Sequence, residues 1–369
     1  MIRLFLAGDV MLGRAIDQIL RHPGDPKLFE GYLHSAEDYV RLAEKTNGPI
    51  PRGVDLDYVW GDAGAVLDAA KPDCGIVNLE TAITDMGAPE PKGINYRMNP
   101  RNAAGLKRLG IDCCVLANNH VLDWGEAGLD QTLDTLRELA MATAGAGRNA
   151  VEAAAPAVLA GANGRVLVFA FAARDSGVPC HWAAQAEKSG VNFINAFDER
   201  NIRSIRAQVV AAKKSGDIVV ASIHWGDNWG YEIPPAHVSF AHGLIDEAMV
   251  DIVHGHSSHH PRRWEVYRGK LILYGCGDFL NDYEGISGHE EYRGDLVLMY
   301  LPVIDEAAGG FLASLDIVPF QIRRFRLNQA TPEDARWLCA TLNSRCRGSG
   351  AAMTLDQNGI LHLKPEWPR

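Results

Sequence analysis

The sequence lacks the features of a membrane-spanning or exported protein. No apolar run reaches the roughly 20 residues that a transmembrane helix needs. The start, MIRLFLAGDVMLGR, has one early arginine and a short apolar run over residues 4–7, whereas a signal peptide needs a longer apolar core and a small-residue cleavage site. We therefore expect no transmembrane segment, a buried first strand at residues 2–7 and, by default, a cytoplasmic location.

The sequence also lacks paired cysteine motifs and an excess of positive charge. The seven cysteines are odd in number, dispersed and without CxxC spacing, which favours reduced structural thiols over disulfides or a structural zinc site. Lysine and arginine total 36 against 46 acidic residues, and the resulting net charge of −10 disfavours a nucleic-acid partner. A hydrophobic fraction of 47% excludes a disordered chain.

Several common catalytic motifs are missing as well. The chain has no GxSxG elbow, no GxxxxGK[ST] phosphate loop and no GxGxxG after the first strand. These absences disfavour a serine hydrolase, a P-loop nucleotide hydrolase and a dinucleotide-binding enzyme.

Instead, the chain has a series of short apolar segments that each end at Asp, Glu, Asn or His. Strands are expected at 2–7, 74–79, 112–117, 166–172, 218–223, 249–253, 271–274 and 361–363, and helices at 36–44, 129–139 and 332–342. The stretch 140–160 is interpreted as a loop and a helix end. In α/β sheets the ligand site lies at the carboxyl ends of the strands, so these polar endings predict a site at one sheet edge.

The first candidates are carboxylates and amides. Asp9 and Glu80 follow buried strands and could bind a metal, although a turn aspartate that caps a helix has the same pattern. Asn119 offers a carbonyl oxygen to a cation, and His120 could be a ligand or an acid/base group. Asp123 could orient His120.

Histidines supply the remaining candidates. His224 is either a ligand or a buried structural histidine, and the segment 254–260 holds four histidines in seven positions, a density that favours metal binding. Asp278 could fix a histidine tautomer, although it could also be a turn residue. Trp225 and Trp229 are candidates for pocket walls. A mixed set of oxygen and nitrogen donors suits Mn, Fe, Zn or, if oxygen dominates, Ca.

The order of these motifs resembles the CapA family of poly-γ-glutamate capsule-synthesis proteins, a branch of the calcineurin-like metallophosphatase superfamily. The matching stretches are GDVMLGR at 8–14, NLETAIT at 78–84, ANNHVLDWGEAGLDQTL at 117–133, HWG at 224–226, GHSSHHP at 255–261, EVYRGK at 265–270 and GCGDFLND at 275–282. The resemblance implies a four-layer α/β/β/α sandwich of two mixed sheets flanked by helices over residues 1–320. Residues 22–60 would be an inserted cap over the site, and 321–369 a C-terminal extension packed on the same domain.

The resemblance also implies roles for single residues. It assigns one or two divalent metal ions to Asp9, Glu80, Asn119, His224, His256 and His259. His120 matches the catalytic histidine, and we add Asp123, His254 and Asp278 as catalytic candidates. The chain departs from the superfamily at two points, because Val10 and Met11 replace the usual Asp-x-His pattern after Asp9, and because Glu80 takes the place of the usual bridging aspartate.

Three functions are consistent with this set. The first is a metal-dependent hydrolase or transferase acting on a peptide, amide or γ-glutamyl bond, with His120 as acid/base group. The second is a metal-dependent epimerase that inverts a Cα centre in a ribosomal peptide such as a lasso peptide, with two His/Asp pairs on opposite faces. The third is a non-catalytic binder of an anionic polymer. An ordinary phosphoesterase is disfavoured by the missing imidazole, because phosphoester cleavage by two ions needs both positions.

Overall fold

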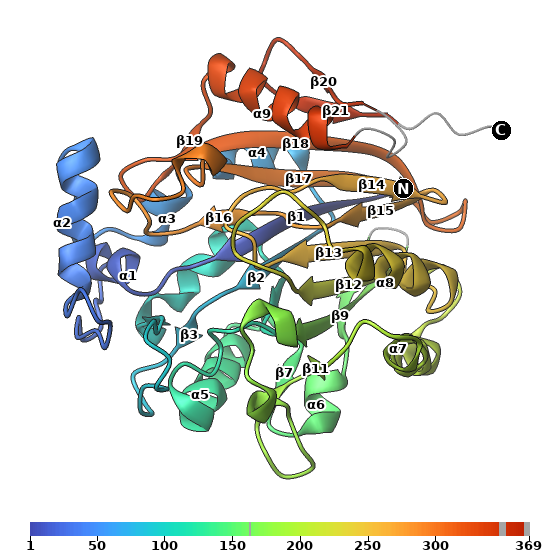
Figure 1. Ribbon diagram of the computed structural model, residues 1–369, viewed down its shortest axis with the longest axis horizontal. Coiled ribbons are helices and arrows are strands. Elements are labelled where there is room, and N and C mark those ends of the chain that lie inside the picture. Colours follow the sequence, from blue (N-terminus) through green and yellow to red (C-terminus); the bar gives the residue numbers. More distant parts are fainter. Residues whose placement is uncertain (162–163, 347–351, 365–369) are drawn as a thin grey trace.

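Strand β9 (Arg165–Ala173) alternates between two hydrophobic cores, which is the pattern expected of a strand covered on both faces. Val166, Val168 and Ala170 belong to the larger core, and Phe169 and Phe171 belong to a smaller one. The computed structural model describes residues 1–161, 164–346 and 352–364. These residues form a pair of mixed sheets that lie between helical layers (Figure 1).

The first sheet has the order β20-β21-β18-β17-β1-β2-β5-β6, with β16 beside β1 and β19 beside β18. Its strands are β1 (Ile2–Val10), β2 (Cys74–Leu79), β5 (Cys113–Val115), β6 (Ala142–Ala144), β16 (Asp278–Leu280), β17 (Leu296–Asp305), β18 (Phe311–Ile322), β19 (Leu327–Gln329), β20 (Thr354–Leu355) and β21 (Leu361–Leu363). Strands β1, β2, β5 and β6 are parallel, and β17 and β18 are antiparallel.

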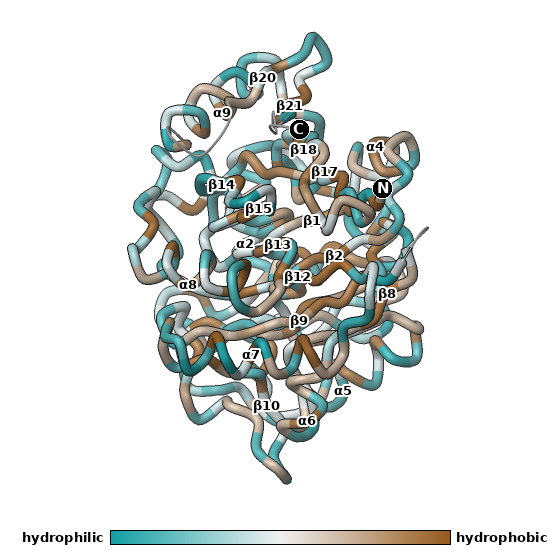
Figure 2. Tube along the Cα trace, turned by 90° about the vertical axis from the view of Figure 1, so that its right-hand side faces the viewer, coloured by the Kyte–Doolittle hydropathy of each residue, from teal (hydrophilic) through white to brown (hydrophobic). Residues whose placement is uncertain are grey.

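The second sheet has the order β11-β9-β12-β13-β15-β14, with β8 beside β9. The strands not yet given are β8 (Ala157–Ala160), β11 (Phe193–Ile194), β12 (Ile218–His224), β13 (Ile252–His256), β14 (Trp264–Tyr267) and β15 (Lys270–Leu273). Two small ribbons pair β3 (Ala82–Ile83) with β4 (Arg97–Met98) and β7 (Ala146–Gly147) with β10 (Gly190–Val191). In Figure 2 the hydrophobic colour is concentrated along β2, β9 and β12.

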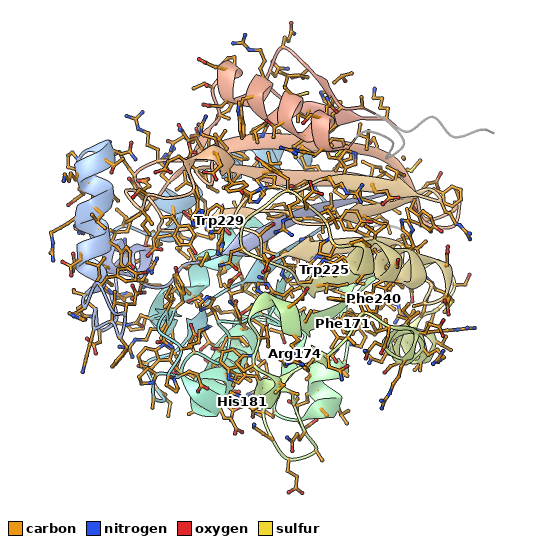
Figure 3. All side chains as sticks on the ribbon, in the orientation of Figure 1. Phe171, Arg174, His181, Trp225, Trp229 and Phe240 are labelled. Atoms are coloured by element: carbon orange, nitrogen blue, oxygen red, sulfur yellow. The ribbon has the colours of Figure 1, made fainter. Side chains whose placement is uncertain are left out.

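Helices cover the sheets. They are α1 (Ala15–Ile19), α2 (Ala36–Asn47), α3 (Leu56–Trp60), α4 (Ala63–Ala70), α5 (Gly125–Glu138), α6 (Ala150–Ala154), α7 (Glu199–Ala212), α8 (Pro235–Asp246) and α9 (Pro332–Arg345). Helices α7 and α8 pack on the outer face of the second sheet through the smaller core. Trp225 lies in that core among Phe171 and Phe240 (Figure 3), so it does not line a pocket.

The architecture is a four-layer α/β/β/α sandwich of two mixed sheets flanked by helices, as the sequence predicted. The structure corrects the prediction for 140–160, which contains β6, β7, α6 and β8 rather than a loop and a helix end. Strands β17 and β18 were not predicted. Among the described residues, no helix has both the length and the apolar character needed to cross a bilayer.

The domain boundaries expected from the sequence stay predictions. Strand β18 runs through residue 320, and β19 and β21 pair with it. Residues 347–351 and 365–369 of the expected extension lie outside the described residues. The segment 22–60 contains α2 and α3, and Figure 1 shows α2 at the same end of the molecule as α1, which follows β1.

A close backbone approach brings β1 against β16. A Cβ atom on Gly8 would lie 1.7 Å from the carbonyl oxygen of Gly277, and the Asp9 N–H donates to that oxygen at 3.1 Å. Only glycine allows this contact. It places Asp9 directly beside Asp278 in the parallel register of the two strands.

Candidate metal centre

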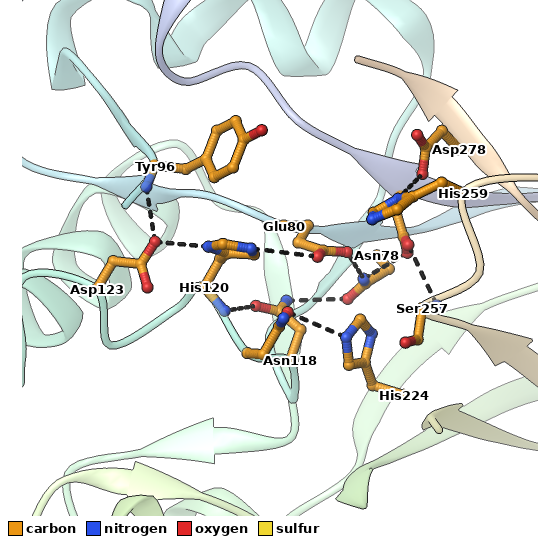
Figure 4. Close-up of polar contacts among 12 residues, drawn as sticks. Asn78, Glu80, Tyr96, Asn118, His120, Asp123, His224, Ser257, His259 and Asp278 are labelled. Carbon is orange, nitrogen blue, oxygen red and sulfur yellow. Dashed lines mark hydrogen bonds and ion pairs between the residues drawn. The ribbon is translucent and has the colours of Figure 1, made fainter. Parts of the chain in front are cut away.

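Strand register gathers the candidate ligands at one edge of the sandwich. Asp9 is paired with Asp278 in the first sheet, and His224 is paired with His256 in the second. Strands β1 and β2 are parallel, and so are β12 and β13, so the carboxyl ends of each pair lie at the same edge of its sheet. The side chains at these ends meet between the two sheets. Figure 4 shows these polar contacts.

Two groups of buried side chains can each hold a metal ion. One is Asp9, His224 and His256, and the other is Asp9, His259 and Asp278; within each group the ligand atoms lie within 4.8 Å of one another. Asp9 is common to both. The resemblance placed Glu80 at the bridging position, and the sequence suggested that Asp278 fixes a histidine tautomer. In the structure Asp9 is the residue common to both groups, and Asp278 is itself a member of one group.

Glu80 and Asn119 lie around these groups. Asn78 donates to Asp9 Oδ1 at 2.7 Å and to Glu80 Oε2 at 3.2 Å, so it holds the two carboxylates together. The Oδ1 atom of Asn119 lies 3.1 Å from His224 Nε2. Both side chains are therefore close enough to the two groups to contribute further oxygen donors.

The charge balance of the cluster fits a cation. Asp9, Glu80 and Asp278 are at most 1% exposed. Burial and the neighbouring Asp278 raise the pKa of Asp9 to about 7, and burial and Asp9 raise the pKa of Glu80 well above its usual value. Carboxylates packed this closely repel one another, and a bound divalent ion would offset that repulsion.

The imidazoles complete a suitable donor set. Burial lowers the pKa values of His224 and His256 well below the usual value, which keeps them in the neutral form that binds metals. The two Nδ1 atoms lie 2.9 Å apart, and His256 Nδ1 lies 3.9 Å from Asp9 Oδ1. Carboxylate oxygens with imidazole nitrogens suit Mn, Fe or Zn better than Ca.

His120 belongs to a separate, adjacent arrangement. Its Nδ1 lies 2.6 Å from Asp123 Oδ2, and its Nε2 lies 3.8 Å from Glu80 Oε1, facing the metal groups (Figure 4). Lys92 pairs with Asp123 Oδ1 at 2.7 Å. Burial lowers the pKa of His120 to about 4. The Asp123 carboxylate favours the tautomer with the proton on Nδ1, which leaves Nε2 on the side of the metal groups.

Both ring nitrogens of His254 have hydrogen-bond partners in the structure. Its Nδ1 lies 2.9 Å from Ser222 Oγ and its Nε2 lies 3.0 Å from the carbonyl oxygen of Ala7. Ser222 Oγ also lies 2.9 Å from His256 Nε2. His254 is thus connected to His256 through Ser222, and its acid/base role stays a prediction.

His259 lies between a metal group and the residues of an adjoining cavity. Its Nδ1 lies 2.9 Å from Asp278 Oδ1, and its Nε2 lies 3.3 Å from the Tyr283 hydroxyl. Burial lowers the pKa of His259, but Asp278 and Asp9 outweigh it, and the net shift is upward. Trp229, an expected pocket residue, has its ring 5.5 Å from that of His259 and lines the adjoining cavity.

Sequence reasoning missed four residues of the site: Asn78, Lys92, Tyr96 and Ser222. Asn78 lies in the quoted NLET motif, so it could have been singled out there. The ring of Tyr96 meets that of His120 edge-on at 4.7 Å, and its backbone N–H donates to Asp123 at 2.6 Å. Lys92 and Tyr96 lie in a loop with no strand pattern, and no sequence signal marks them.

A buried arginine ties the segment 22–60 to the site. Arg14 makes two hydrogen bonds to Asp282, at 2.6 and 2.8 Å, and one to Glu30 at 3.0 Å. Its guanidinium lies 3.8 Å from the ring centre of Tyr39 in α2 and 4.7 Å from that of Tyr96. The side chains of Arg14 and Asp282 are at most 2% exposed.

Removing one partner of this buried pair should cost much of the stability of the protein. Asp282→Ala leaves the Arg14 charge without its bidentate partner, and such losses cost about 3–5 kcal/mol. Urea unfolding measures the change. The control is Asp55→Ala, which breaks the exposed pair with Arg21 at 3.0 Å and should cost less than about 1 kcal/mol. Equal effects of the two substitutions would show that the buried network does not stabilise the fold.

The sandwich and its two donor groups define a metallophosphatase-like protein. The chain belongs to the family of the bacterial capsule synthesis protein PGA_cap, whose model matches residues 3–283. It is 47% identical over 367 residues to a probable polyglutamine synthesis accessory protein of Mycobacterium tuberculosis, covering 99% of this chain and 96% of the relative. It is 24% identical over 319 residues to the capsule biosynthesis protein CapA of Bacillus anthracis, covering 86% and 67%. A crystal structure of a novel phosphatase from Mycoplasma pneumoniae is similar with a TM-score of 0.45 and 11% identity, covering 91% and 96%.

Proposed function

We propose that this protein is a metal-dependent hydrolase that cleaves amide bonds in a γ-glutamyl or related peptide polymer. The observation that carries the proposal is the position of His120, held by Asp123 and facing two adjacent groups of metal donors. The names of the relatives, which refer to polyglutamine synthesis and capsule biosynthesis, support the substrate class.

In this proposal one set of residues binds metal, and His120 with its partner Asp123 transfers protons. Asp9, His224, His256, His259 and Asp278 would hold one or two divalent ions, which supply Lewis acidity and lower the pKa of water when bound. His120 Nε2 accepts a proton as water attacks the amide carbon and passes it to the leaving nitrogen as the C–N bond breaks. Asp123 stabilises the imidazolium formed between these steps, and Lys92 is ion-paired with the other oxygen of Asp123.

A second candidate, Cα epimerisation, is favoured by one observation. The site places two His–Asp pairs near one another, His120 with Asp123 and His259 with Asp278, and Figure 4 shows Glu80 between them. Two such pairs on opposite sides of a Cα–H could remove and return a proton. Hydrolysis is preferred because His259 and Asp278 also belong to a metal group, and a histidine bound through its free nitrogen cannot serve as the base.

Deuterium labelling separates the two reactions. We expect that oligo-γ-glutamate incubated in D₂O with the metal-loaded protein gives shorter chains without deuterium at Cα, because hydrolysis leaves the Cα–H bond intact. Mass spectrometry and NMR measure both quantities. Deuterium at Cα of an uncleaved peptide would instead establish epimerisation and end the proposal of hydrolysis.

A phosphate assay gives the counter-test. We expect slow release of phosphate from simple phosphoesters, because the chain lacks the imidazole of the Asp-x-His pattern and phosphoester cleavage needs a pair of ions about 3.5–4 Å apart. Rapid phosphate release with no cleavage of oligo-γ-glutamate would overturn the proposed function.

A further inference from the structure

A cavity of about 380 Å³ adjoins the metal centre. Its wall includes Tyr283 and Trp229, whose side chains lie beside His259. Pockets of roughly 300–1,000 Å³ are of the size that binds small molecules or short segments of polymer. A substrate segment that leaves the reacting bond on the His259 side can therefore enter this cavity.

A second cavity, of about 540 Å³, continues the first. Asn47 and Arg323 line both cavities, so the two share a wall. Beyond that wall the second cavity is lined by Tyr58, Arg324, Arg326 and Asn328. We call the lining of the second cavity, including Asn47 and Arg323, the arginine groove.

The arginine groove concentrates positive charge on a chain whose net charge is −10. The exposed guanidinium of Arg323 makes no hydrogen bond or ion pair with any described residue. Arg324 donates to the carbonyl oxygen of Pro49, which is uncharged, and Arg326 is paired with Asp62 at 2.9 Å. Among the described residues, two of the three arginines thus have no carboxylate within ion-pair distance.

The turn that carries these arginines is held in an unfavourable backbone conformation. Arg324 and Phe325 have φ values of 60° and 52°, in the left-handed region that favours glycine or asparagine. Glu284 accepts their backbone N–H groups at 2.8 and 3.2 Å, and the Phe325 side chain is fully buried. Strained turns that the surrounding structure holds in place are concentrated at functional sites.

We propose that the arginine groove binds the carboxylates of an anionic polymer while the bond to be cleaved lies at the metal centre. The chemical class is a polycarboxylate chain, and Arg323 is its first contact. The identity of the reacting bond rests on the proposed function, whereas polymer binding does not. Because the contacts are exposed ion pairs, binding should weaken as salt is added.

The test measures binding of fluorescein-labelled oligo-γ-glutamate by fluorescence anisotropy. Arg323→Gln should weaken binding about 2- to 5-fold, and the triple variant Arg323→Gln/Arg324→Gln/Arg326→Gln roughly 10- to 100-fold, the range for one and for three exposed charge pairs. The matched control is Arg206→Gln, on the exposed side of α7 and on the opposite side of the molecule from β19 (Figure 1); its binding should be unchanged. The Arg323 guanidinium has no hydrogen-bonded partner among the described residues, so its single substitution should not disturb folding.

Three outcomes would overturn this proposal. They are unchanged binding by Arg323→Gln and the triple variant when both remain folded by circular dichroism, an equal loss in Arg206→Gln, and equally tight, arginine-dependent binding of polyphosphate or single-stranded DNA of the same charge. The last outcome would assign the groove to phosphate polymers. Binding that persists in a protein without any cleavage activity would contradict the proposed function and leave the groove assignment intact.

Discussion

Asp9→Asn is expected to remove metal from both positions at once, because Asp9 is common to the two donor groups. His224→Ala should affect mainly one position. In Asp9→Asn the loss of metal affinity should exceed the roughly 10- to 100-fold cost of removing a residue that only supports a ligand. Elemental analysis of protein purified without a metal-affinity tag measures the bound ions per chain, and oligo-γ-glutamate cleavage should fall in parallel.

The metal-free forms supply the complementary measurement. Burial and Asp278 raise the pKa of Asp9 to about 7, so in the absence of metal the ionised carboxylate opposes folding as the pH rises. Metal-free Asp9→Asn protein should therefore be at least as stable at pH 8 as metal-free wild type. The control is Asp251→Asn, a carboxylate paired with Lys213 and Lys270, which should keep its metal. One full ion per chain in Asp9→Asn would refute the shared role of Asp9.

His120→Gln is expected to lower the rate of cleavage by roughly 10²–10⁴-fold, the range for loss of a general acid/base. Metal content should stay unchanged, because His120 belongs to neither donor group in the described portion of the chain. The same protein sample serves for both measurements, steady-state kinetics and elemental analysis.

Substitution of Asp123, the partner of His120, gives a second test of the proton-transfer role. Asp123→Asn keeps the size of the side chain but removes the charge that stabilises the imidazolium, so its rate should also fall while substrate affinity is retained. Loss of metal in His120→Gln would make His120 a ligand and would invalidate the proton-transfer role. A rate close to that of wild type would do the same.

Much of the sandwich could be predicted because strands that are buried on both faces have continuous apolar sequences. Strands β2 and β21 have the expected bounds, and β9 and β12 are each one residue longer at one or both ends. Strands β17 and β18 escaped prediction. They contain Pro302 and Pro319, and proline within a run ordinarily argues against a strand.

The side-chain geometry of the site could be predicted less well, because it depends on neighbours from distant segments. His254 and His256 lie two apart on one strand and so share a face. The contacts of His254 with Ser222 and with the Ala7 carbonyl come from two other strands, and His256 rather than His254 belongs to a donor group. Lys92 is similar, since its pairing with Asp123 arises from the folding of a loop over the site.

The two sheets share no strand pairing among the described residues, yet both contribute to the metal centre. Asp9 and Asp278 come from one sheet, and His224 and His256 come from the other. An ion held by Asp9, His224 and His256 would therefore cross-link the two layers, and its binding free energy would add to the work needed to separate them. Removing the metal would then loosen the contact between the layers and make the folded chain easier for proteases to open.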